Sequence, residues 1–139
     1  MAQHSLAVDI KGSKTTVQGD AKVIQVDYSS HESIKQALTG VHVAISTVAG
    51  VALDVQGKIA VAGKEAGVEL FVPSEFGGIT EGKTEGRFGA KANVQRQLKA
   101  LGMPYTLFYT GPFADHIWAT YVIITLCHSV RFTADPKIL

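Results

Sequence analysis

Residues 41–77, VHVAISTVAGVALDVQGKIAVAGKEAGVELFVPSEFG, decide the fold class. The first six are apolar and partly β-branched, and they predict a buried strand at 41–46. Apolar side chains at helical spacing then predict a helix over 53–66. Residues 69–72 predict a second strand, which Pro73 interrupts. A strand, a helix and a strand of these lengths predict a right-handed βαβ unit with parallel strands.

The same alternation extends toward the N-terminus. Residues 22–27 (KVIQVD) predict a strand because β-branched side chains dominate them, and residues 6–10 (LAVDI) predict a shorter one. A helix is expected after the first of these. Ser29 and Glu32 have the spacing of a capping box, in which each side chain accepts a hydrogen bond from the other residue's N–H group.

Toward the C-terminus, a glycine-rich loop is expected over 77–86, a helix over 90–101 and a strand over 105–109 (YTLFY). Residues 119–139 show no further strand pattern. Together these segments predict a single α/β domain over residues 1–139, with a Rossmann-like parallel sheet and flanking helices. Ligands of such sheets bind beyond the carboxyl ends of the strands.

The composition excludes several classes of protein. The chain has 139 residues, 46% hydrophobic and 18% charged, which is typical of a globular domain. A net charge of +1 does not indicate binding to nucleic acid or to an anionic membrane. The longest apolar stretch, 117–130, is shorter than the ~20 residues of a membrane-crossing helix, so no membrane contact is expected. The lone Cys127 cannot form an internal disulfide, which favours a cytoplasmic location.

The histidines do not indicate a metal site. They lack the i,i+4 and Cys-x-x-Cys spacings of zinc ligands: His4, His31, His42, His116 and His128. We therefore expect no bound metal.

Residues 77–84, GGITEGKT, match the phosphate-binding pattern G-x-x-x-x-G-K-[ST], with Lys83 on the terminal phosphates and Thr84 on magnesium. In such a site the loop opens directly into a helix, whereas two glycines in the next five residues disfavour a helix here. Glu81 and Glu85 also offset the charge of Lys83. We interpret this stretch as a polar loop, and a phosphate-loop nucleotide hydrolase as the less favoured alternative.

Four motifs, in order, resemble the NmrA-like, isoflavone-reductase-like family of atypical short-chain dehydrogenase/reductases. They are residues 72–77 (VPSEFG), Lys91 in a helix, residues 102–106 (GMPYT) and residues 111–113 (GPF). The resemblance covers about residues 23–113. Several separated motifs in the right order are more specific than any one of them.

The resemblance implies an oxidoreductase that binds NADP(H), with NAD(H) as the other possibility, and that reduces a small aromatic or phenolic substrate. It implies that Lys91 is the catalytic general acid and base. The Tyr-x-x-x-Lys pair of most short-chain dehydrogenases is absent. The implied cofactor-binding residues lie after three predicted strands: Thr47, Val48, Ala49, Gly50, Ser74, Glu75, Phe76, Gly111, Pro112 and Phe113.

The sequence departs from the family at one important place. The family begins with a strand and a G-x-x-G-x-x-G loop that holds the cofactor's pyrophosphate, and nothing before Lys22 has this glycine spacing. We therefore expect a fold without the first strand and glycine-rich phosphate loop, truncated at both ends and impaired as a reductase. In the strand order 3-2-1-4-5-6 that strand is central, so its absence exposes strand edges and favours homo-oligomers. The alternatives are a non-catalytic dinucleotide-binding regulator and an inert remnant.

Overall fold

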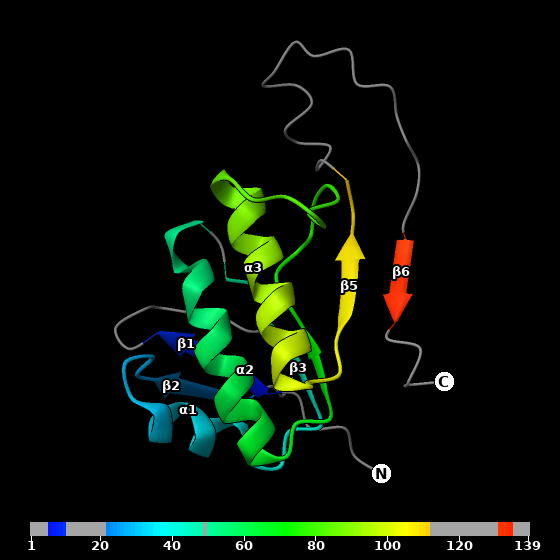
Figure 1. Ribbon diagram of the computed structural model, residues 1–139. Coiled ribbons are helices and arrows are strands. Elements are labelled where there is room, and N and C mark those ends of the chain that lie inside the picture. Colours follow the sequence, from blue (N-terminus) through cyan, green and yellow to red (C-terminus); the bar gives the residue numbers. More distant parts are fainter. Residues whose placement is uncertain (1–5, 11–21, 49, 112–130, 135–139) are drawn as a thin grey trace.

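The structure of the protein is a computed structural model that describes residues 6–10, 22–48, 50–111 and 131–134 (Figure 1). Its strands are β1 (Leu6–Ile10), β2 (Lys22–Val26), β3 (Val43–Ile45), β4 (Leu70–Val72), β5 (Thr106–Tyr109) and β6 (Arg131–Ala134). Its helices are α1 (His31–Leu38), α2 (Val55–Ala66) and α3 (Gly86–Leu101), and a short 3-10 helix, η1 (Gly50–Asp54), precedes α2. The strands and helices that the sequence predicts are all present.

The neighbouring strands among β1 to β5 are parallel, as predicted. β1 pairs in parallel with β2, and β3 pairs in parallel with β4, where Ala44 lies opposite Phe71. β5 adjoins β4 through a parallel bridge between Phe71 and Tyr105, and the Phe71 N–H donates to the Pro104 main-chain oxygen over 2.9 Å. The parallel sheet therefore has two parts, β2-β1 and β3-β4-β5.

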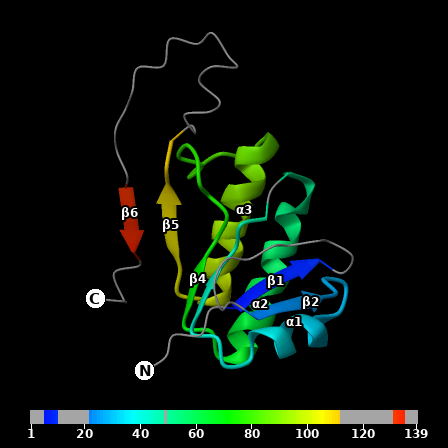
Figure 2. The ribbon, with the colours of Figure 1, turned by 180° about the vertical axis from the view of Figure 1, so that it is seen from behind.

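The division of the sheet lies between β1 and β3, which are not paired with each other. A Rossmann sheet has the order 3-2-1-4-5-6, with its first strand at the centre. The observed order is that order without the central strand among the described residues, in agreement with the sequence prediction. Figure 2 shows the consequence: β1 and β2 run across the molecule, at a steep angle to β4 and β5.

Helices α2 and α3 lie side by side on one face of the part formed by β3, β4 and β5 (Figures 1 and 2). Phe71 of β4 and Leu98 of α3 are completely buried between these layers. Alternate residues of a strand point to opposite faces, so Ala44 faces this core while Val43 and Ile45 are 49% and 63% exposed. Helices α2 and α3 thus flank this part of the sheet, as predicted.

The N-terminus of α1 differs from the prediction. Its N-cap is Ser30, whose Oγ accepts from the Ser33 N–H over 3.3 Å. Ser29, the predicted cap, instead donates its N–H and its hydroxyl to Asp27 Oδ1, over 2.8 and 2.6 Å. The capping-box prediction was wrong because Asp27, directly after β2, draws Ser29 into a turn.

The N-terminus of α3 also differs, because this helix begins at Gly86 rather than at residue 90. Gly86 has a φ of +56°, and a Cβ on Gly89 would lie 2.4 Å from the carbonyl carbon and oxygen of Thr84. Close packing of the loop against the first turn of the helix therefore uses the glycines that disfavour a helix by propensity. Tertiary packing decided this boundary.

The expectation of no strand within residues 119–139 was wrong as well. β6 pairs antiparallel with β5, with Phe108 opposite Phe132. None of the described helices is long and apolar enough to cross a membrane. The apolar stretch 117–130 and Cys127 lie outside the described residues.

Candidate active site

Three segments that the sequence assigns to the site converge at the carboxyl ends of β3, β4 and β5 (Figure 1). The Ser46 N–H donates to the Val72 main-chain oxygen over 2.8 Å, which joins the ends of β3 and β4. The Gly111 N–H donates to the Gly77 main-chain oxygen over 3.1 Å, which joins the loop after β4 to the end of β5. These loops lie together, as expected of a ligand site in a parallel sheet.

The predicted cofactor-binding residues differ in their exposure. Thr47 is exposed, Val48, Phe76 and Gly111 are half-buried, and Ser74 and Glu75 are buried. Gly50 begins η1. Ala49, Pro112 and Phe113 lie outside the described residues. Glu75 is only 1% exposed, so its side chain points into the protein.

Lys91, the predicted catalytic residue, lies in the second turn of α3. Its Nζ donates to the main-chain oxygen of Glu75, in the loop after β4. The side chain is half-buried, and this burial lowers the pKa of Lys91 below that of an ordinary lysine. Glu75 raises the pKa and Arg87 lowers it, and both effects are smaller than that of burial. A lysine with a lowered pKa at a ligand-binding edge can act as a general acid or base.

Beneath the loop lies a buried polar cluster that the sequence did not reveal. The Thr80 hydroxyl donates to Glu75 Oε2 over 2.9 Å, and Gln95 Nε2 donates to Glu75 Oε1 and to Thr80 Oγ1, each over 2.8 Å. Gln95 Nε2 also lies 3.5 Å from the Tyr109 hydroxyl, whose pKa burial and the nearby Glu75 raise. The one feature of the sequence that could have indicated Gln95 is its spacing, because it lies four residues after Lys91 and so on the same side of the helix.

A second polar contact supports the other end of the loop. Gln56, in the first turn of α2, is 1% exposed, and its Oε1 accepts from the Ser74 N–H over 2.7 Å. Gln56 Nε2 and Ser46 Oγ are buried without a hydrogen-bond partner among the described residues. The pattern of apolar residues in the sequence did not predict that Gln56 is buried, because a single amide side chain that binds one loop leaves no repeating pattern.

Phe76 has an unusual backbone conformation. Its φ is +24°, and a non-glycine residue in this region costs on the order of 1–3 kcal/mol. Its ring stacks on Phe108 of β5, with centroids 6.5 Å apart and planes at 19°. The hydrogen bonds on both sides of Phe76 hold the loop in this conformation, and such strain is concentrated at functional sites.

The residues present fit one half of a dinucleotide cofactor. Lys91, Ser74 and Phe76 lie around the carboxyl ends of β4 and β5, on the edge where Rossmann-like sheets bind dinucleotides, and nearby Ser46 and Gln56 each have a buried polar atom without a partner among the described residues. The pyrophosphate half has no equivalent, because the described residues contain no glycine loop that opens a helix at the sheet centre. Within the same residues, no group of three potential metal ligands occurs.

The phosphate-loop alternative is not supported by the loop's hydrogen bonds. The Lys83 N–H donates to the Thr80 main-chain oxygen over 3.0 Å, so this group is not directed to a phosphate. Thr80 is completely buried and bound to Glu75. The helix start at Gly86 removes one objection to a phosphate loop, but the loop folds onto the Glu75 cluster instead.

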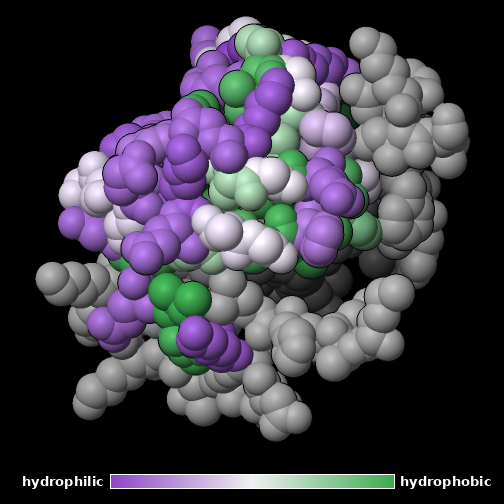
Figure 3. Space-filling model, turned by 90° about the horizontal axis from the view of Figure 1, so that it is seen from below, coloured by the Kyte–Doolittle hydropathy of each residue, from purple (hydrophilic) through white to green (hydrophobic). Residues whose placement is uncertain are grey.

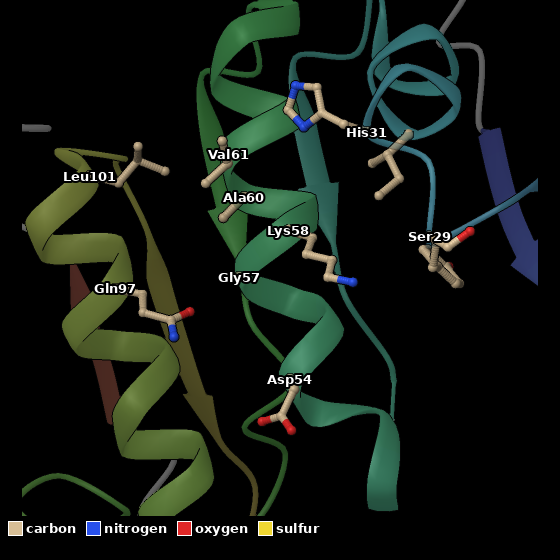
Figure 4. A pocket seen from close by; sticks show the side chains of 11 residues that line it. Ser29, His31, Asp54, Gly57, Lys58, Ala60, Val61, Gln97 and Leu101 are labelled. Carbon is tan, nitrogen blue, oxygen red and sulfur yellow. The ribbon is translucent and has the colours of Figure 1, made fainter.

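A well-defined groove among the described residues lies elsewhere. A groove of about 510 Å³ runs along α2, where Figure 4 shows Lys58 pointing toward Ser29, while Gln97 of α3 points toward Gly57. It is lined by Tyr28 and Ser29, just after β2, and by none of the predicted site residues. The end of the molecule opposite these loops, seen from below in Figure 3, mixes hydrophilic and hydrophobic residues over its described surface. We take the loops after β3, β4 and β5 as the candidate site, because these loops and Lys91 meet there.

The fold and this site define a Rossmann-like α/β domain with its ligand loops at the carboxyl ends of parallel strands. The sequence model of the NmrA-like family matches residues 7–133, and the chain belongs to this family. The match extends beyond residues 23–113, which the motif resemblance covers.

The relatives include plant proteins that are named as reductases. The chain is 37% identical over 106 residues to "Isoflavone reductase homolog P3" of Arabidopsis thaliana, a match that covers 72% of this chain and 34% of the relative. It is 40% identical over 100 residues to "Phenylcoumaran benzylic ether reductase Pyrc5" of Pyrus communis, covering 68% of this chain and 32% of the relative. The chain thus spans about one third of the length of these relatives.

Solved structures show the same fold. The crystal structure of isoflavone reductase superposes with a TM-score of 0.69 at 24% identity, covering 91% of this chain and 47% of that one. The structure of AtPrR2 with NADP+ and (+)pinoresinol superposes with a TM-score of 0.63 at 31% identity, covering 70% of this chain and 35% of that one.

Proposed function

We propose that this chain is part of an NADP(H)-dependent reductase that acts on a small aromatic substrate, with Lys91 as the general acid and base. The observation that carries the proposal is the contact of Lys91 Nζ with the Glu75 main-chain oxygen, at the carboxyl end of β4. The names of the relatives support the class of substrate, and a neighbour with NADP+ and (+)pinoresinol supports the cofactor.

In this proposal each residue of the site has a defined task. NADPH supplies a hydride when bound. Lys91 donates from Nζ the proton that neutralises the negative charge developing on the substrate, and its lowered pKa makes this donation easier. Ser74 and Phe76 line the nicotinamide side, and Thr47 and Val48 border the cofactor at the end of β3. Gly50 and Glu75, with Ala49, Gly111, Pro112 and Phe113, complete the predicted cofactor-binding set.

The absent glycine loop has a consequence for affinity. Backbone N–H groups at a helix N-terminus supply much of the binding of a pyrophosphate. Without such a loop before Lys22, we expect this chain to bind NADPH more weakly than a reductase that has one. We further propose a cytoplasmic location and self-association through the edges of β1 and β3 that no described strand pairs with, and no nucleic-acid partner.

A titration of the purified chain with NADPH, followed by cofactor fluorescence, tests the proposal. We expect saturable binding that Lys91→Met weakens only modestly, together with loss of substrate reduction in that variant. If NADPH binding is present but neither it nor any other activity of the chain changes in Lys91→Met, the result would favour a non-catalytic dinucleotide-binding regulator. No NADPH binding by the folded chain would contradict the proposal for this chain.

ATP with magnesium is the control ligand, and Lys83→Ala is the matched variant. We expect no ATP binding and no effect of Lys83→Ala on NADPH binding, because the Lys83 backbone N–H is used within the loop. ATP binding that is lost in Lys83→Ala would instead establish a phosphate-loop nucleotide site.

A further inference from the structure

Two side chains of helix α3 bind Glu75, in the loop after β4. Lys91 Nζ donates to the main-chain oxygen of Glu75, and one helical turn later Gln95 Nε2 donates to the Glu75 carboxyl group over 2.8 Å. Residues four apart lie on one face of a helix, so both contacts are made from the same side of α3. The loop is thereby held at its backbone and at its side chain by one rigid element.

A third contact closes the arrangement. Thr80 donates its hydroxyl to the second carboxyl oxygen of Glu75 and accepts from Gln95, so the three side chains form a closed ring of hydrogen bonds. Glu75 is 1%, Thr80 0% and Gln95 5% exposed. Water therefore does not compete for these bonds, and loss of one donor leaves a buried oxygen unpaired.

The hydrogen-bonded ring of Glu75, Thr80 and Gln95 fixes the position of the Glu75 carbonyl group. The carboxyl group is fixed on one side of the residue, and on the other side Phe76 is held at a φ of +24°. The peptide group between them has little freedom to rotate. Its oxygen is the acceptor of the Lys91 ammonium, so a displaced peptide would also displace the lysine.

We propose that Thr80 and Gln95 are positioning residues, which fix the Glu75 main-chain oxygen and through it the location of the Lys91 ammonium group. The catalytic meaning of this arrangement rests on the function proposed above, whereas the arrangement itself can be tested without cofactor. Neither residue belongs to the four motifs by which the family was identified from the sequence.

The experiment measures the titration midpoint of Lys91 in the whole chain, from the pH dependence of its Cε chemical shift. The signal is assigned by its disappearance in Lys91→Arg. In the folded chain, burial lowers this pKa more than the charge of Glu75 raises it, and Arg87 lowers it further. A lysine released into solvent loses the largest of these effects, so its pKa should rise.

Two substitutions at one position separate hydrogen bonding from packing. Thr80→Val keeps the shape and removes the hydroxyl, whereas Thr80→Ser keeps the hydroxyl and removes a methyl group. We expect Thr80→Val to raise the Lys91 midpoint, with at least about a twofold increase in the ratio of protonated to neutral amine at a given pH. Thr80→Ser should leave it unchanged. A shift in Thr80→Ser equal to that in Thr80→Val would overturn the proposal.

Gln95→Leu tests the same ring from the helix. Gln97→Leu is its matched control, since Gln97 is exposed on the same helix and its side chain lies against Gly57 of α2. The first should raise the Lys91 midpoint and the second should not. Equal midpoints in Gln95→Leu and the wild type would argue against a positioning role.

A measurement on the unaltered chain keeps the test decisive if a variant does not fold. The Thr80 hydroxyl proton should exchange slowly enough with water to be observed by NMR near 5 °C, because both its oxygen and its acceptor are buried. Rapid exchange of this proton would contradict the closed ring. NADPH titration of the same samples is separate: a chain that binds no cofactor but shows the expected midpoints would lose the proposed function and keep the positioning arrangement.

Discussion

Two glycines in the helices beside the candidate site provide a quantitative test of the packing, since one substitution should have opposite effects at them. Gly57 lies in α2 and Gly89 in the first turn of α3. Alanine is favoured over glycine in a helix interior by about 1 kcal/mol. Gly→Ala should therefore stabilise the protein wherever the new methyl group finds space.

The surroundings of the two glycines differ in whether they can yield. A Cβ on Gly57 would lie 2.2 Å from Oε1 of Gln97, the end of a flexible and exposed side chain. Moving that side chain aside costs about 0.5 kcal/mol of rotamer freedom, so Gly57→Ala should stabilise by about 0.5 kcal/mol. A Cβ on Gly89 would lie 2.4 Å from backbone atoms of Thr84, which cannot rotate away. Overpacking costs about 1–3 kcal/mol, so Gly89→Ala should destabilise by about 1 kcal/mol.

Urea unfolding followed by circular dichroism gives the free energy of unfolding of each variant. Gly57→Ala in a Gln97→Ala background, analysed as a double-mutant cycle, should recover the full alanine preference of about 1 kcal/mol. The reasoning is refuted if Gly57→Ala destabilises the chain even in that background, or if Gly89→Ala is stabilising. The first result would mean that α2 and α3 are not placed as described, and the second that the loop at Thr84 does not pack on α3 as described.

Three further predictions concern charged side chains. Because the pKa of Lys91 is lower in the folded chain than in the unfolded chain, the stability of the wild type relative to Lys91→Met should rise as the pH increases from the folded pKa toward the unfolded pKa. Urea unfolding from pH 7 to 10.5 measures this difference. A difference that falls with rising pH would contradict the prediction. Lys64→Met should lower the free energy of unfolding by about 0.5–1 kcal/mol, because Lys64 Nζ donates to the Leu101 main-chain oxygen at the C-terminus of α3; thermal unfolding would show no change if this cap is unimportant. His31 and Lys35 lower the pKa of the Glu65 carboxyl, so its NMR titration midpoint should lie below that of an ordinary glutamate, and the associated stability should be lost as the pH falls through that midpoint; a midpoint at the ordinary value would exclude both pairs.

The predictable part of the fold was its repeating part. β2 and β5 follow from runs of β-branched and aromatic side chains, and α1 follows from the spacing of Ile34, Ala37 and Leu38, all of which are buried. The boundaries were less predictable. Ser30 caps α1 because Asp27 binds Ser29, and such competition between neighbouring polar residues leaves no periodic pattern.

Only part of the candidate site was predicted from the sequence. The loop after β4 and Lys91 were found from short motifs, and the structure joins them through the Glu75 main-chain oxygen. Thr80 and Gln95 were not found. Each is an ordinary polar residue in its own segment, and only the packing of the loop on α3 makes them neighbours.

The sequence by itself determined the order of strands and helices, the family, and the missing glycine loop, because these depend on local propensity, periodicity and motif. The tertiary structure alone decided where the sheet divides, which way Glu75 points, and which residues hold Lys91. These features depend on contacts between segments far apart in the chain, such as Glu75 with Gln95. The free energy of such contacts comes from burial and hydrogen bonding in the assembled core, which no local stretch of sequence contains.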